Sequence, residues 1–191
     1  MARTLVSVVT VDVRGKLAEF DVAVLQLAVL KGVFSDVVEE QVTYVNAPLF
    51  AAQRGLEVGL TSDPESPTYR NLVTVRGAMA DGRPVTVSGT LYGKNRVARL
   101  TEVAGFEIDL AASGRLLFFT YADRPGVVGA VGAALGEAAV NIAGAQVSRT
   151  TEGGEALMAV TVDSPVSAEL LEEIADRIGA REARAADLDT L

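Results

Sequence analysis

The second half of the chain alternates between two hydrophobic periods, and that order constrains the fold more than any other feature of the sequence. Apolar runs typical of strands lie at residues 116–121, 142–148, 156–162 and 182–188. Residues 125–138 and the segment after Ser164-Pro165 have the three- and four-residue spacing of helices. This βαββαβ order predicts a ferredoxin-like fold with both helices on one face of the sheet and the other face free to meet a partner.

The first half carries more strand patterns than helix patterns. Strands are predicted at residues 3–13, 56–60, 71–77, 84–91, 96–103 and 106–110. The third and fourth runs alternate polar and apolar residues around Asp81-Gly82, as the arms of a β-hairpin do. Helices are predicted at residues 17–32 and 46–53. The fold class is therefore α+β, with a mixed-sheet domain and two helices before the ferredoxin-like unit.

The longer helix of the first half rests on the spacing of four side chains. Phe20, Val24, Leu27 and Leu30 recur at three- or four-residue intervals, so they would share one apolar face. This pattern predicts an amphipathic helix that ends at Lys31-Gly32.

Two segments without a regular pattern divide the chain. Residues 62–67 are polar and contain two prolines, which predicts a loop. Residues 111–114 are small and mark a junction. We therefore expect one domain at residues 1–112 and a second at residues 113–191.

The composition excludes several classes of function. The 191 residues carry a net charge of −8, whereas a nucleic-acid partner would need a concentrated basic face. The sequence has no Cys and no His, which removes thiolate and imidazole metal sites, Ser-His-Asp triads and disulfides. The apolar run at residues 22–30 is too short to span a bilayer, and the first residues do not form a signal peptide. We expect a cytoplasmic protein without nucleic-acid or membrane partners that is no enzyme by itself.

The segment from Tyr121 to Gly129 combines features of a ligand site. Asp123 is placed to cap the following helix, and Pro125 suits its first turn. Backbone N–H groups at a helix start can hold a carboxylate, and Asp123 beside them can take an ammonium group. A free amino acid carries both charges, so the junction fits a zwitterion. An ordinary capped helix with small residues for packing explains the same residues.

A second group of charged residues is basic. Arg70 follows the proline-containing loop, and Lys94, Arg96 and Arg99 follow the turn at Tyr92-Gly93. If the fold brings them together, they could hold a phosphate, because Arg can donate two hydrogen bonds to one anion. A solvated face explains the same charges, since alternating strand positions usually point to water.

The glycines at positions 126, 129 and 132 differ from the dinucleotide-binding fingerprint. That fingerprint is G-x-G-x-x-G at the start of a βαβ unit in a parallel sheet, and the first spacing here is wrong. These small residues fit close helix packing instead.

Two sets of motifs resemble known domains and together cover nearly the whole chain. In the second half, Asp123-Arg124-Pro125-Gly126, Leu135-Gly136 and Val140-Asn141-Ile142 resemble the ACT domain, which binds small effectors, usually amino acids, at contacts between paired domains. The first half resembles the intervening domain of long-form phosphoglycerate dehydrogenases through Val45-Asn46-Ala47-Pro48, Ala52-Gln53-Arg54-Gly55, Ser88-Gly89-Thr90-Leu91-Tyr92-Gly93 and Gly105-Phe106-Glu107-Ile108-Asp109.

The resemblance implies a regulatory region in L-serine biosynthesis, where the family's product L-serine binds between two ACT domains and inhibits the enzyme. The effector-binding residues that it implies are Tyr121, Asp123, Gly126, Val127 and Val128 of one chain and Asn141 of its partner. The implied partners are L-serine, a second copy of the chain and the catalytic domains of the dehydrogenase.

The family's catalytic and NAD-binding domains would lie before the first residue, so no catalytic residue, metal or cofactor is expected in this chain. Some members place cations at the positions of Glu107 and Ala111, and some carry His and Asn at those of Tyr121 and Asp123. Three alternatives stay open: an ACT sensor of another amino acid, a subunit related to L-serine dehydratases, and a module that serves assembly alone.

Overall fold

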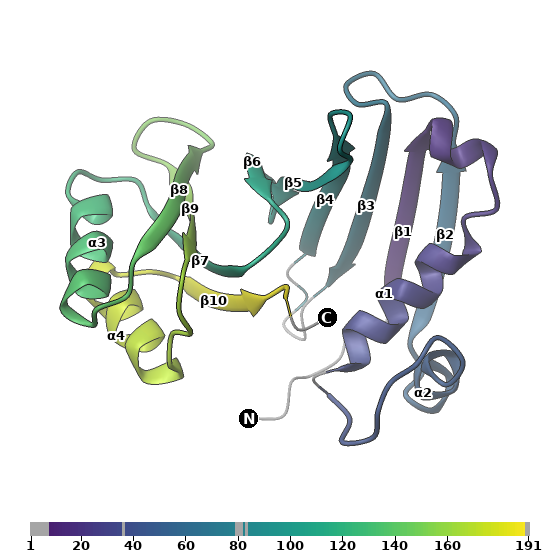
Figure 1. Cartoon of the computed structure of the whole chain (residues 1–191), viewed down its shortest axis with the longest axis horizontal. Helices are drawn as coiled ribbons and strands as arrows, with labels where there is room; N and C mark the ends of the chain where they lie inside the picture. Colours follow the sequence, from purple (N-terminus) through teal and green to yellow (C-terminus); the bar gives the residue numbers. More distant parts are fainter. Residues whose placement is uncertain (1–7, 36, 79–81, 83, 190–191) are drawn as a thin grey trace. The chain divides into compact units, whose positions relative to one another are not determined.

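The structure is a computed structural model that describes residues 8–35, 37–78, 82 and 84–189 (Figure 1). The chain forms two compact units, Met1–Gly105 and Phe106–Leu191, called unit 1 and unit 2 below. The strand β6 (Phe106–Ala111) is counted with unit 2, whereas the sequence placed the domain boundary after it, at residue 112. That boundary stays a prediction.

Unit 1 contains a mixed sheet, as predicted. Its strands are β1 (Val8–Gly15), β2 (Glu57–Asp63), β3 (Asn71–Ala78), β4 (Pro84–Tyr92) and β5 (Val97–Val103), in the order β2-β1-β3-β4-β5. The β1–β2 pair is parallel and the other pairs are antiparallel. The predicted first strand started at residue 3, and residues 3–7 lie outside the described part of the chain.

The prediction for the second strand was too short. Residue 63 still pairs with β1, because the parallel register continues from Val8↔Glu57 to Arg14↔Asp63. The predicted loop at residues 62–67 therefore begins two residues later than expected.

The helix predicted at residues 17–32 was wrong at both ends. A short 3₁₀ helix, η1 (Lys16–Glu19), comes first, and α1 runs over Ala23–Ser35. The N–H of Ala23 donates to Oδ1 of Asp21 at 3.0 Å, so α1 starts after Asp21. Phe20 and Val24 are 65% and 57% exposed, so they do not belong to the buried face. The side chains that α1 buries are those of Leu30 and Phe34.

The second predicted helix is confirmed as α2 (Ala47–Gln53), which has Pro48 in its first turn. Its buried residues join those of α1 and the sheet in one apolar cluster. The buried members are Val9, Leu30, Phe34, Val42, Ala47, Phe50, Ala51 and Leu56.

The opposite face of β1 carries a buried carboxylate. Asp12 is 6% exposed and accepts hydrogen bonds from Arg14 Nε at 2.9 Å and Thr61 Oγ1 at 3.0 Å, with Arg76 Nη1 at 3.6 Å. Burial acts to raise the pKa of Asp12, but these hydrogen bonds and the two positive charges outweigh it and leave the pKa below its usual value. The charged form of Asp12 therefore stabilises the fold.

Unit 2 confirms the ferredoxin-like order. Its sheet contains β7 (Arg115–Ala122), β8 (Ile142–Arg149), β9 (Glu155–Val162) and β10 (Glu182–Asp187) in the order β10-β7-β9-β8, with every pair antiparallel. The helices α3 (Val127–Glu137) and α4 (Ala168–Ile178) lie on one side of this sheet (Figure 1). Gly179 ends α4 in the left-handed conformation, which suits glycine.

The other face of the unit 2 sheet is not free, contrary to the prediction. Leu116, Leu157 and Ala159 alternate with the residues that pack under the helices, and each is at most 1% exposed. The strand β6 contacts β8 and β9, and the N–H of Asp109 donates to Gln146 Oε1 at 2.9 Å. A partner would therefore have to meet unit 2 elsewhere than on this covered face. None of the described helices is long and apolar enough to cross a membrane.

Candidate functional site

The junction of β7 and α3 begins its helix later than predicted. Gly126 occupies the N-cap position with φ +92°, a left-handed conformation that suits glycine, and α3 starts at Val127. Pro125 therefore precedes the helix instead of lying in its first turn. No side chain caps this end, and first-turn N–H groups have no partner within a helix. The amides that follow Gly126 can therefore receive an anion.

Asp123 does not cap α3, contrary to the prediction, because its carboxylate turns towards the β8–β9 connection. Its Oδ2 accepts from Arg149 Nη1 at 3.2 Å and from the N–H of Gly153 at 3.3 Å. Its own N–H donates to the carbonyl oxygen of Gly154 at 2.8 Å. The side chain keeps 20% of its surface exposed, so the carboxylate is oriented and still reachable from solvent.

Tyr121 is fully buried, although it lies on a strand at the edge of the candidate site. It is 2% exposed and belongs to the apolar core beneath α3 and α4. Burial, and then the negative charge of Asp123, raises the pKa of Tyr121 above its usual value, so the phenol is neutral at pH 7. Val127 is also buried, whereas Val128 is 57% exposed at the start of α3.

Asn141 lies at the other end of the sheet from Asp123. β7 and β8 are both antiparallel to β9, so they run in the same direction. Asp123 follows the end of β7, whereas Asn141 precedes the start of β8, and a strand of this length spans about 25 Å. Asn141 Nδ2 donates to Asp163 Oδ2 at 2.6 Å. One chain therefore brings Asp123 together with Gly126 but does not bring Asn141 to them.

Arg149 was missed by the sequence analysis. It ends β8 and binds the carboxylate of Asp123, 26 residues away in the sequence. The available signal was the glycine-containing turn at residues 151–154, which folds β9 back along β8 and returns the chain to the end of β7. Only the sheet order reveals that this turn reaches Asp123.

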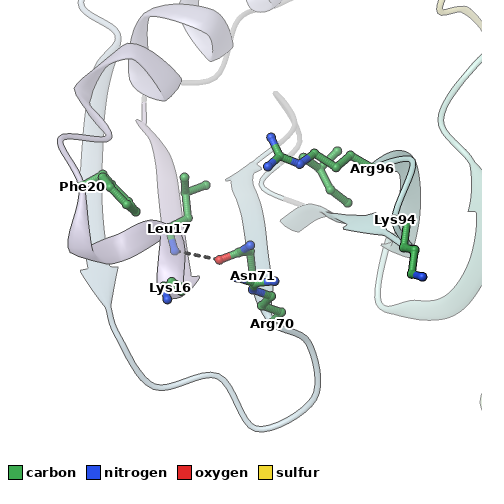
Figure 2. A pocket seen from close by; sticks show the side chains of 9 residues that line it. Lys16, Leu17, Phe20, Arg70, Asn71, Lys94 and Arg96 are labelled. Atoms are coloured by element: carbon green, nitrogen blue, oxygen red, sulfur yellow. Dashed lines mark hydrogen bonds between the residues drawn. The ribbon is translucent and has the colours of Figure 1, made fainter.

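The basic residues form a second location, in unit 1. They lie around a pocket of about 640 Å³ (Figure 2). Its lining residues are Lys16, Leu17, Phe20, Arg70, Asn71, Leu91, Gly93, Lys94 and Arg96. Three of the four residues predicted as an anion site line this pocket. Arg99 does not, and Lys16 was missed because it lies far from the others in the sequence.

The β7–α3 junction does not have the geometry of a dinucleotide-binding site. The sheet around α3 is antiparallel, and β9 separates β7 from β8, so the junction lacks the adjacent parallel strands of a dinucleotide site. Among the described residues, no group of three or more Cys, His, Asp or Glu side chains could hold a metal ion.

Comparison with protein families assigns both units. The family described as the D-3-phosphoglycerate dehydrogenase intervening domain matches residues 1–104, and the ACT domain matches residues 115–179. The chain belongs to the D-3-phosphoglycerate dehydrogenase family. It corresponds to the intervening and ACT domains of that family, as the motifs predicted.

Individual phosphoglycerate dehydrogenases match along most of the chain. The enzyme of Mycobacterium leprae is 41% identical over 179 residues, and that of Mycobacterium tuberculosis is 43% identical over 179 residues. Each alignment covers 94% of this chain and 34% of the relative. The enzyme of Synechocystis is 35% identical over 175 residues, which are 91% of this chain and 31% of the relative. The chain thus spans about a third of the length of these phosphoglycerate dehydrogenases, in their C-terminal part.

Proposed function

We propose that the chain is the regulatory part of an NAD-dependent D-3-phosphoglycerate dehydrogenase, and that L-serine binds between the ACT domains of two copies and inhibits the enzyme. The β7–α3 junction lacks the adjacent parallel strands of a dinucleotide site, and we place the NAD site in another part of the dehydrogenase. The observation that carries the proposal is the division of the effector residues between the two ends of the unit 2 sheet. Asp123 and Gly126 lie at one end, and Asn141 lies at the other.

The free edge of the sheet offers a way to join the two ends. β8 is an outer strand, and its outward backbone groups can pair with a second copy. A two-fold axis through paired β8 strands makes them antiparallel. The end at Ile142 then meets the partner's end at Arg149. Because Asp123 contacts Arg149, the partner's Asn141 would lie beside Asp123.

The assembled junction has the chemistry for a zwitterionic amino acid. The effector's ammonium group would donate to Asp123 and to the amide oxygen of the partner's Asn141. Its carboxylate would accept from the first amides of α3, after Gly126 and through Val127 and Val128. Tyr121 would form the rigid base beneath these groups, since it is part of the packed core.

Arg149 competes with the effector's ammonium group for the carboxylate of Asp123. Its guanidinium group occupies Asp123 in the single chain, yet its side chain is 55% exposed. Exposed ion pairs of this kind contribute little free energy, so an effector's ammonium can displace Arg149 at small cost. The Gly153 N–H still holds the carboxylate in place during this exchange.

Isothermal titration of L-serine into the chain, with glycine for comparison, tests the proposal. We expect saturable binding at one site per ACT domain, abolished by Asp123→Ala. Glu137→Gln is a matched control, because Glu137 is an exposed carboxylate that pairs with Arg177 instead. Serine binding that survives Asp123→Ala would refute the site. If a different amino acid binds instead, that amino acid is the effector and L-serine is not. If no amino acid of a panel shifts the thermal melt, the chain serves assembly alone.

Regulation needs the effector to favour one arrangement of the regulatory domains. Coupling between an effector site and a catalytic site is typically worth about 1–3 kcal/mol. In the complete dehydrogenase, serine should therefore inhibit wild type and leave the Asp123→Ala variant active but insensitive. Loss of inhibition without loss of activity would distinguish regulation from an effect on folding.

A further inference from the structure

The connection between β7 and α3 carries the proposed effector residues, and two neighbouring segments hold it. The N–H of Asp123 donates to the carbonyl oxygen of Gly154, between β8 and β9, at 2.8 Å. One residue later, Nη2 of Arg124 donates to the carbonyl oxygen of Ile178, at the end of α4, also at 2.8 Å. Two consecutive residues are thus tied to two different neighbours, directly before the helix start that is to receive the effector.

The end of α4 is suited to bind the guanidinium group of Arg124. Carbonyl groups in the last turn of a helix have no partner within the helix, and the helix dipole makes this end negative. Gly179 turns the chain into the left-handed conformation directly after Ile178. A Cβ on Gly179 would lie 3.9 Å from Nη2 of Arg124, so the guanidinium group lies against this turn. Its hydrogen bond gives the carbonyl oxygen of Ile178 a partner.

Arg124 differs from the other two arginines near the junction in what it binds. Arg149 and Arg181 pair with carboxylate groups, and their side chains are 55% and 70% exposed. Arg124 binds a backbone carbonyl oxygen and, within the described residues, forms no ion pair. Ile178, which supplies that oxygen, is 1% exposed and belongs to the core of unit 2. Arg124 is therefore tied to a fixed point of the fold.

The start of α3 depends on such an outside restraint. No described side chain caps it, and Gly126 at its N-cap is the residue type with the most backbone freedom. Only Pro125 lies between Arg124 and Gly126, and its ring restricts its own φ. A restraint on Arg124 is therefore passed along a stiff link to Gly126 and to the amides that follow it.

We propose that Arg124 is the positioning residue of the serine site, an inference that rests on the function proposed above. By holding the carbonyl oxygen of Ile178, Arg124 keeps the first amides of α3 where they can receive the effector's carboxylate. It does so without touching the effector itself. A loop that is already ordered loses less conformational entropy when the ligand binds, so the affinity is higher.

Isothermal titration of L-serine into the full chain tests this role. Arg124→Met keeps the apolar stem and removes every donor, and it should weaken serine binding by about tenfold, as for the loss of one charged hydrogen bond. Arg124→Lys keeps a charged donor and should recover most of the affinity. Arg181→Gln is the matched control and should bind serine as wild type does. Arg181 also follows the end of α4, but its side chain pairs with Glu155.

Nuclear magnetic resonance relaxation of the ligand-free chain separates positioning from a general loss of stability. In Arg124→Met the order parameters of the Gly126 and Val127 amides should fall from about 0.85, typical of rigid backbone, towards about 0.6. Those of β8 should stay at the wild-type values. Equal order parameters at Gly126 and Val127 in wild type and variant would overturn the proposal. So would a fall throughout unit 2, because Arg124 would then serve the fold as a whole.

The titration also distinguishes this inference from the proposed function. Wild type that binds serine as tightly as Arg124→Met does would refute the role of Arg124 alone, and so would an equal loss of affinity in Arg181→Gln. Failure of Arg124→Lys to recover affinity would show that a charged donor is not what matters, which also contradicts the proposal. Wild type that binds no L-serine would refute the proposed function and this inference with it.

Discussion

The two candidate sites differ in how completely one chain builds them. The pocket of unit 1 has its cations and its apolar wall in a single copy, and no described residue forms an ion pair with these cations. The junction of unit 2 has its charge already neutralised by Arg149 and lacks Asn141, which lies at the far end of the sheet. The first arrangement favours a ligand that a single chain binds by itself. The second favours a ligand whose affinity depends on association of two chains.

Asp123→Ala should have the largest effect on serine affinity, and its effect should be confined to the site of unit 2. L-Serine binding should weaken by about 100-fold and no longer saturate at concentrations that saturate wild type, because the effector loses a charged hydrogen bond. Isothermal titration checks this, and a lower melting temperature in the absence of serine would show that the variant disturbs the fold instead of the site.

Removal of the buried carboxylate of unit 1 should act on stability and not on serine. Asp12→Asn should lower the free energy of unfolding by about 1–3 kcal/mol, because the amide keeps one accepting oxygen, for Thr61, but loses the charge-assisted hydrogen bond from Arg14. Chemical denaturation measures this, with Glu39→Gln as an exposed control. A loss of the same size in both variants would contradict the role of Asp12.

The same carboxylate predicts a pH dependence. The pKa of Asp12 is lower in the folded state than its value of about 3.9 in an unfolded chain, so its stabilisation is complete above that value. It is lost as the pH falls through the lower, folded pKa. Wild type should therefore lose more stability than Asp12→Asn over this acid range in thermal melts. Identical pH profiles would contradict the assignment.

Association through β8 can be tested separately. Ala145 is exposed near the middle of β8, so Ala145→Lys should leave the single chain folded and place two ammonium groups against each other in the proposed dimer. Dimerisation and serine binding should each weaken by about tenfold. Sedimentation and calorimetry measure the two effects. Full serine binding by a monomeric variant would exclude a site shared between chains.

The smallest expected change in serine affinity comes from replacing Arg149, which competes for Asp123. Arg149→Gln should tighten L-serine by about two- to fivefold, because it frees Asp123 at the cost of an exposed ion pair. Arg181→Gln removes another exposed pair, with Glu155, and should have no effect. Weaker serine binding in Arg149→Gln would show that Arg149 helps to hold the effector.

The fold was predictable where local signals agreed with one another. Three local signals indicate the same helix α4: the three- and four-residue spacing of its apolar side chains, Ser167 at its N-cap and Gly179 at its C-cap. The start of α1 was not predictable from local signals. Its sequence is apolar on several faces, and the cap at Asp21 outweighs the spacing of Phe20 and Val24. The cover over the second sheet face also escaped prediction, since nothing local shows where β6 packs.

The sites follow the same rule. Asp123 and Gly126 could be placed from their position between a strand and a helix, but the side chain of Asp123 turns to Arg149, which only the sheet order brings near. In the pocket, the cations of the hairpin are close in sequence, whereas Lys16 joins them through the β1–β3 pairing. Local sequence thus indicated which residues carry charge, and long-range pairing decided which of them meet.

A mixed-dimer titration tests the shared serine site most directly. Asp123→Ala and Asn141→Ala chains, each carrying a different affinity tag, are co-expressed, and dimers that hold both are isolated. Each variant alone should fail to bind L-serine, whereas every mixed dimer should recover one intact site, made of Asp123 from one chain and Asn141 from the other. Mixed dimers that remain as inactive as the single variants would contradict a site built by two copies.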